Sequence, residues 1–253
     1  MRFALLMLVF AATGSGCMHN RAGTMTSLLT GSDPLTGPTG GGLTSSTEKA
    51  DGELRGKDAA MLSIVMAESL EKEEKAEKDV QAIAYYERAR EQDAAMTERV
   101  GRRLAVLYDR VDQQAKAMNE YQELLKKRPK DSGLLNDIGY SYYNRGQWAE
   151  AESHLLRAIA ADKHNKRAWV NLGMAQAQQG KTADAITAFE KAVSPAEAQA
   201  NLGFVLTTQG KREEALAAYR RALTLEPTLP IAQAAIARLE QPAGAERGVR
   251  NAE

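Results

Sequence analysis

The stretch that decides the fold runs from residue 132 to residue 195. It reads SGLLNDIGYSYYNRGQWAEAESHLLRAIAADKHN over residues 132–165 and KRAWVNLGMAQAQQGKTADAITAFEKAVSP over residues 166–195. One pattern occurs twice: Leu135, Ile138, Gly139, Tyr142, Gly146, Ala151, Leu155 and Ala158, then Trp169, Leu172, Gly173, Gln176, Gly180, Ala185, Phe189 and Ala192. Each residue of the second set follows its counterpart by 34 positions. A fixed period of this size indicates a repeat protein.

The spacing within each copy predicts two helices joined by a tight turn. The large apolar residues of the first half fall on one helical face. Gly139 and Ala151 remove bulk at the level where the two helices approach each other. Gly146 lies in the turn, where glycine adopts a positive φ at little cost. One such hairpin cannot bury its apolar face alone, so we expect neighbouring hairpins to stack.

On these residues the chain resembles the tetratricopeptide repeat (TPR) family. The small residue of the second helix recurs at Ala82, Ala117, Ala151, Ala185 and Ala215, in steps of 35, 34, 34 and 30 residues. The resemblance implies an all-α TPR solenoid of about five repeats over residues 58–241. The first repeat is degenerate, because its first helix lacks the Leu-Gly pair. Residues 231–240 are expected to form a closing helix.

The step of 30 residues singles out the fourth repeat. The chain between Ala192 and Leu202 is four residues shorter than in a standard repeat. Ser194-Pro195 lies there, and a helix usually ends before a proline. We therefore expect a truncated second helix in this repeat. The alternative is a harmless change in loop length.

The N-terminus resembles a secretory signal. Arg2 is followed by an apolar run, residues 3–12, and then by small residues up to Cys17, the only cysteine. Such a run is too short to span a membrane as a mature helix. Residues 1–17 resemble a bacterial lipoprotein signal, which implies a lipid on Cys17, although Gly14 stands where leucine is usual. The alternative is ordinary secretion with an incidental cysteine.

Composition divides the remaining chain. Residues 18–57 are rich in Gly, Ser, Thr and Pro without periodicity, which predicts a disordered tether. The polar tail, residues 242–253, is also predicted to be disordered. The 33 basic and 33 acidic side chains cancel, so no overall field favours nucleic acid.

No catalytic or cofactor motif emerges. The histidines are His19, His154 and His164, and the last two are not at the spacing of a helical metal pair. The chain has no Gly-x-Ser-x-Gly elbow, and the repeats fill the folded length. We therefore expect a protein without enzymatic activity, cofactor or metal.

The resemblance implies a concave groove lined by the first helices of successive repeats. The residues at groove positions are Arg99, Arg102, Arg103, Val106 and Arg110 in the second repeat, Asn136, Asp137, Tyr140 and Tyr143 in the third, Arg167, Asn171, Met174 and Gln178 in the fourth, and Asn201, Phe204 and Thr208 in the fifth. The amides of Asn171 and Asn201 share a register and could bind a peptide backbone. Tyr140, Met174 and Phe204 share another register. They form either an apolar strip in the groove or part of the solenoid wall.

The four arginines of the second repeat lie on one side of one helix. Like charges at this spacing repel one another unless a nearby anion neutralises them. The hypothesis is that an acidic segment or a terminal carboxylate of a partner supplies this negative charge. Within the repeat, Asp109 points elsewhere and Glu98 can shield only Arg99. The alternative is a solvated surface with screened charges.

These observations predict an exported, lipid-anchored TPR scaffold that faces the periplasm and binds a protein or peptide partner. The lipoprotein signal combined with TPR repeats resembles accessory proteins of pilus and secretion systems, including Tad/Flp assembly proteins and pilotins. The resemblance implies a role in assembling such a system. The alternatives are a periplasmic adaptor for envelope-modifying enzymes and an enzyme whose chemistry the sequence does not display.

Overall fold

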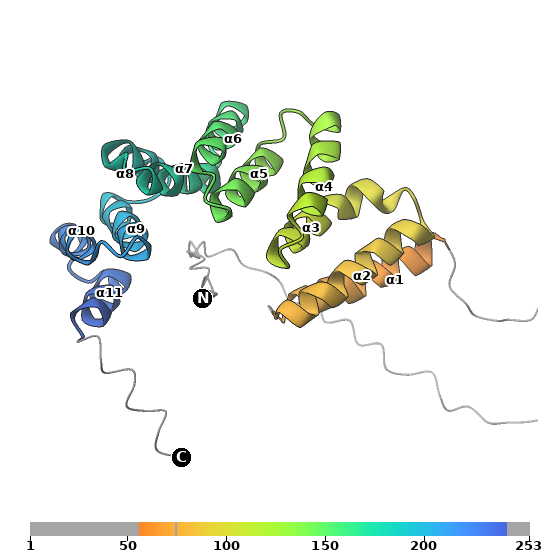
Figure 1. The fold of residues 1–253 in the computed structure, drawn as a ribbon, viewed down its shortest axis with the longest axis horizontal. Coiled ribbons are helices and arrows are strands. Elements are labelled where there is room, and N and C mark those ends of the chain that lie inside the picture. Colours follow the sequence, from red (N-terminus) through yellow and green to blue (C-terminus); the bar gives the residue numbers. More distant parts are fainter. Residues whose placement is uncertain (1–55, 74, 242–253) are drawn as a thin grey trace, which may run out of the picture. The chain divides into compact units, whose positions relative to one another are not determined.

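The structure is a computed structural model that describes residues 56–241, apart from residue 74. The predicted signal, Cys17, nearly all of the predicted tether and the predicted tail lie outside the described residues. The described part is all-α and contains eleven helices in the following order (Figure 1). They are α1 (Lys57–Glu71), α2 (Ala76–Gln92), α3 (Met96–Arg110), α4 (Gln114–Lys127), α5 (Ser132–Asn144), α6 (Trp148–Ala161), α7 (Lys166–Gln178), α8 (Thr182–Glu190), α9 (Pro195–Thr208), α10 (Arg212–Leu225) and α11 (Pro230–Glu240).

The first ten helices form five hairpins, each made of an odd-numbered helix and the even-numbered helix that follows it. Each hairpin packs on the next one along the chain, and α11 packs on α10. From α3 onward, each odd-numbered helix also contacts the next odd-numbered helix, as far as α9. This arrangement confirms the predicted solenoid, its degenerate first hairpin and its closing helix.

Small residues set the distance between the two helices of a hairpin. A Cβ atom built on Gly173 would lie 2.6 Å from the Phe189 ring and 2.9 Å from the carbonyl oxygen of Ala185. Glycine is therefore required for α7 and α8 to pack this closely. The turn residue Gly180 has a φ of 77°, in the left-handed region that favours glycine. Both predicted roles of glycine in the repeat are confirmed.

The apolar pattern forms a core that runs along the array. Ala151 and Leu155 of α6 are fully buried, as are their counterparts Ala185 and Phe189 of α8. Each hairpin contributes such residues to a cluster that it shares with its neighbours. The stability of each hairpin therefore depends on its contacts with the adjacent ones.

The fourth hairpin is shortened as expected. Its second helix, α8, has nine residues, whereas α6 and α10 have 14 each. Helix α9 begins at Pro195 with a capping box: the Ser194 side chain accepts a hydrogen bond from the Glu197 backbone N–H at 3.2 Å, and the Glu197 side chain accepts one from the Ser194 N–H at 2.9 Å. The new helix thus begins where the standard repeat would still be in its second helix.

None of the described helices combines the length and apolar character that a membrane-spanning helix requires.

Candidate protein-binding surface

The inner face is the surface formed by the predicted groove residues of α3, α5, α7 and α9. These four helices contact one another in order, and side-chain hydrogen bonds join residues 35 positions apart, about one repeat. Side chains from different repeats can therefore bond to one another or bind one extended partner.

An amide pair links α5 and α7. Asn171 Nδ2 donates a hydrogen bond to Asn136 Oδ1 at 2.9 Å, and Asn136 Nδ2 donates one to Asp137 Oδ1 at 3.3 Å. Only 1% of Asn136 is exposed. Asn136 was predicted to contact a partner, but its burial excludes direct contact, so that prediction is corrected. It holds Asn171, which is half-buried.

A second polar link connects three repeats. Gln178 Nε2 lies 3.3 Å from the Tyr143 hydroxyl and 3.3 Å from Thr208 Oγ1, and it donates to both oxygens. Gln209 Nε2 donates to Gln178 Oε1 at 3.1 Å. The predicted groove residue Gln178 therefore joins α5, α7 and α9, and it holds Tyr143 and Thr208 in place.

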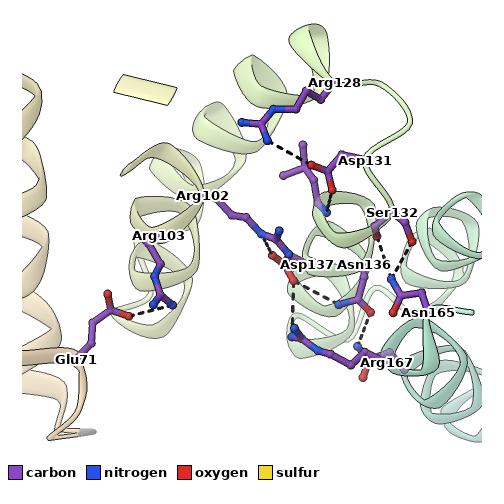
Figure 2. A network of polar contacts seen from close by, with 12 residues as sticks. Glu71, Arg102, Arg103, Arg128, Asp131, Ser132, Asn136, Asp137, Asn165 and Arg167 are labelled. Atoms are coloured by element: carbon purple, nitrogen blue, oxygen red, sulfur yellow. Dashed lines mark hydrogen bonds and ion pairs between the residues drawn. The ribbon is translucent and has the colours of Figure 1, made fainter. Parts of the chain in front are cut away.

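Three arginines of α3 have carboxylate partners within the chain. Figure 2 shows those of Arg102 and Arg103. The pairs are Arg102 Nε–Asp137 Oδ2 at 2.6 Å, Arg103 Nη1–Glu71 Oε2 at 3.7 Å and Arg110 Nη2–Asp79 Oδ1 at 2.9 Å. The premise that these three arginines lack an anion in their own chain is therefore wrong. The carboxylates belong to α5, the end of α1 and α2, so the sequence of α3 alone could not reveal them. Glu98, expected to shield Arg99, instead pairs with Arg128 at 2.7 Å.

The ion pairs are unequally exposed, and this inequality sets the charge of the inner face. The side chains of Glu71, Asp79 and Asp137 are 13%, 5% and 9% exposed. Those of their partners Arg103, Arg110 and Arg102 are 59%, 33% and 43% exposed. The carboxylates thus lie beneath the guanidinium groups, and solvent meets mainly positive charge.

Two further arginines add to this charge. Arg167 is 76% exposed, and its Nη2 lies 3.8 Å from Asp137 Oδ1, a carboxylate already engaged by Arg102 (Figure 2). Arg99 is exposed, and its Nη1 lies 3.1 Å from the sulfur of Met61. Four of the five arginines therefore pair with three largely buried carboxylates, and the fifth, Arg99, contacts a methionine sulfur instead. The surplus of cations favours an anionic ligand.

Burial shifts the pKa of one of these carboxylates, that of Asp79. Desolvation raises the pKa of Asp79, the Arg110 guanidinium opposes this effect, and Glu71 adds to it. The raised pKa shows that the single ion pair only partly compensates for burial.

The inner face also carries an apolar strip, which consists of Tyr140, Met174 and Phe204. Tyr140 and Tyr143 stack with their ring centroids 6.1 Å apart. Tyr140, Met174 and Phe204, predicted to share a register, are all half-buried. Met174 and Phe204 pack against the core shared by α7 to α11. Met174 and Phe204 therefore belong to the wall, and all three residues also present part of their surface to solvent.

Burial raises the pKa of both Tyr140 and Tyr143, so both phenols are neutral at physiological pH.

Asn201 and Val106 are also half-buried, so each keeps part of its surface exposed to solvent, as a position in the groove requires. Among the described residues, no group of three His, Cys, Asp or Glu side chains is arranged to hold a metal ion.

Stacked hairpins whose first helices contact one another define an α-solenoid. Models of the tetratricopeptide repeat match residues 136–201 and residues 196–229. The chain therefore carries tetratricopeptide repeats, which generally mediate protein–protein interaction. A comparison with curated proteins gave no match.

Several solved structures have a fold similar to that of this chain. The TPR protein TTC0263 of Thermus thermophilus is 18% identical over 72% of this chain and 98% of its own, with a TM-score of 0.53. A tetratricopeptide repeat protein of Parabacteroides merdae is 15% identical over 72% of each chain, with a TM-score of 0.54. PilF of Pseudomonas aeruginosa is 20% identical over 72% of this chain and 90% of its own, with a TM-score of 0.51. At these identities the likeness concerns the fold alone.

Proposed function

We propose that the protein is a non-catalytic scaffold that binds a protein partner on its inner face. The observation that carries this proposal is the arrangement of exposed arginines above buried carboxylates, together with the half-exposed strip of Tyr140, Met174 and Phe204. A partner that combines acidic and apolar side chains complements both features.

The partner is an extended peptide or a helix with its acidic end over α3 and its apolar side chains toward α9. Arg99 and Arg167 supply the least compensated charges at the start and middle of the face. The Asn171 amide is held by Asn136 on one side, and it keeps a carbonyl oxygen for a backbone N–H of the partner. The arginines of the ion pairs steer the approach, and the apolar strip supplies buried apolar contact.

The proposal is tested most sharply by reversing the charge of arginines that form no close ion pair with a buried carboxylate. Arg99→Glu combined with Arg167→Glu leaves the close Arg102–Asp137 pair intact. The control is Arg157→Glu combined with Arg221→Glu, a change of equal charge on exposed positions of α6 and α10. Partners are captured from the native envelope with wild-type protein, and their affinities are then measured by titration.

We expect the inner-face double variant to bind at least about tenfold more weakly, because two favourable charges become repulsive. The control should bind like the wild type, and added salt should weaken wild-type binding. Equal loss in both double variants, or wild-type affinity in Arg99→Glu/Arg167→Glu, would place the interface elsewhere.

We also propose where in the cell the scaffold is located. The residues that support it are the charged and apolar start of the chain, the small residues before Cys17 and the Gly/Ser/Thr-rich stretch that follows. A lipid on Cys17 tethers the repeats to a bacterial envelope membrane on the periplasmic side. There the scaffold assists the assembly of a pilus or secretion system.

The anchor is tested by fractionation. Cys17→Ser should move the protein from the membrane fraction to the soluble fraction, because a lipid chain supplies the apolar attachment. Mass spectrometry of the wild type should show an acylated N-terminal cysteine after removal of the signal. A wild-type protein without lipid, together with unchanged fractionation of the variant, would contradict the anchor but leave binding on the inner face open.

A further inference from the structure

Helix α1 is the first helix of the array (Figure 1). An exposed apolar stripe lies in the middle of this helix. Leu62, Val65 and Met66 are 51%, 54% and 42% exposed. They stand at positions i, i+3 and i+4, so they share one helical face. They are three of the seven large hydrophobic residues that are exposed in the described part of the chain.

The opposite side of α1 packs against other helices of the array. Ala60, Ile64 and Ala67 are buried in the core that α1 shares with α2 and α3. Glu71 and Met61 reach arginines of α3. In a stack of hairpins, the exposed side of the first helix is where a preceding hairpin would pack, so the stripe is an unsatisfied stacking surface.

Charges at the two ends of the stripe are self-complementary. Asp58 precedes Val65 by seven residues, and Lys72 follows it by seven, so each stands two helical turns from Val65 on the same side. Lys72 keeps a right-handed helical conformation at the end of α1. Both side chains are exposed, and neither forms an ion pair with another described residue.

We propose that the occupant of this stripe is a second copy of the chain, with the two α1 helices packed antiparallel about Val65. In that register the two Val65 side chains meet at the twofold axis. Asp58 of each copy faces Lys72 of the other copy. Leu62 of each copy packs near Met66 of the other, so one arrangement satisfies the apolar stripe and both charge pairs.

The opposite end of the array does not offer an equivalent surface. The exposed residues of α11 are Pro230, Gln233, Ala234, Ala237, Arg238 and Glu240. This polar and small-residue face disfavours head-to-tail stacking on the α1 stripe. The isologous pairing closes after two copies.

The interface is small. It centres on one helix of 15 residues, below the size of a standard stable interface. A reversible dimer with a dissociation constant on the order of micromolar is therefore expected.

Sedimentation equilibrium tests the pairing on the full chain with Cys17→Ser, which keeps lipid from driving association. We expect a concentration-dependent dimer. Asp58→Lys and Lys72→Asp should each weaken it by about tenfold, because each replaces two attractive pairs with two repulsive ones. The combined variant should restore dimerisation, since the charges are then exchanged rather than removed. Circular dichroism confirms that the variants remain folded.

Cysteine crosslinking tests the axis in the same Cys17→Ser background. Val65→Cys should form a disulfide-linked dimer on mild oxidation, whereas the control Ala217→Cys, exposed on α10, should not. A monomer at all concentrations, or a dimer unaffected by either charge variant, would overturn the proposal.

One rival occupant lies in the chain itself. Met25, Leu28 and Leu29 have the same i, i+3, i+4 spacing, outside the described residues. An intramolecular disulfide in Leu28→Cys/Val65→Cys, together with a monomeric mass, would show that this segment covers the stripe and would overturn the pairing of two copies. The test does not depend on the inner face, so either proposal can fail alone.

Discussion

Replacing Gly173 with alanine should destabilise the fourth hairpin. The added Cβ would lie 2.6 Å from two ring carbons of Phe189 and 2.9 Å from the carbonyl oxygen of Ala185. The backbone oxygen cannot rotate away, so α7 and α8 must separate. Overpacking of this kind costs about 1–3 kcal/mol. The higher helix propensity of alanine offsets about 1 kcal/mol of that cost.

A matched substitution in the second hairpin should have the opposite sign. A Cβ on Gly101 would meet Glu120 Oε2 at 3.4 Å and Leu124 at 3.5 Å, which are ordinary contacts. Gly101→Ala should therefore stabilise the protein by about 0.5–1 kcal/mol through helix propensity and reduced freedom of the unfolded chain.

Urea unfolding, followed by far-ultraviolet circular dichroism at about 222 nm, measures both free energies of unfolding. The expected order is Gly101→Ala, wild type, Gly173→Ala, from most to least stable. Equal stability of the two variants, or a more stable Gly173→Ala, would refute the close approach of α7 and α8.

Two smaller predictions concern a cap and a carboxylate. Ser194→Ala should cost about 1 kcal/mol by removing the cap of α9, whereas Ser153→Ala, at an exposed site on α6, should cost less than about 0.5 kcal/mol in the same urea assay. Burial raises the pKa of Glu152, but hydrogen bonds from Lys181 and two glutamines outweigh burial, so its pKa lies below the ordinary value. Its stabilisation is present above the unfolded pKa and is lost as pH falls through the folded pKa. Glu152→Gln should therefore cost about 1 kcal/mol at about pH 7 and little near pH 3, as urea unfolding at the two pH values would show.

The repeat architecture could be predicted because its cause is local and periodic. Gly139 and Gly173, the turn glycines and the buried alanines occur at a fixed period, and each has a steric role that recurs in every hairpin. The shortened α8 was predictable for a similar reason, since a missing helical turn and Ser194-Pro195 coincide in the sequence.

The side-chain contacts of the inner face could be predicted only in part. The repeat register placed Asn136, Asn171 and Gln178 on the correct helices, but it could not show that Asn171 bonds to Asn136 or that Gln178 bonds to Tyr143 and Thr208. Asp137 follows Arg102 by 35 residues, close to one period, so the register did hold a signal for that pair. Glu71 and Asp79 belong to the degenerate first hairpin, where the pattern is too weak to align their side chains with α3.

The most direct test of the scaffold proposal is site-specific photocrosslinking. A benzophenone amino acid replaces Tyr140 or Phe204 on the inner face, and matched controls place it at Leu156 of α6 and Leu225 of α10, which are exposed on second helices. Binding on the inner face predicts that the captured partner crosslinks at Tyr140 and Phe204 but not at the two controls. Crosslinks confined to Leu156 or Leu225 would contradict it.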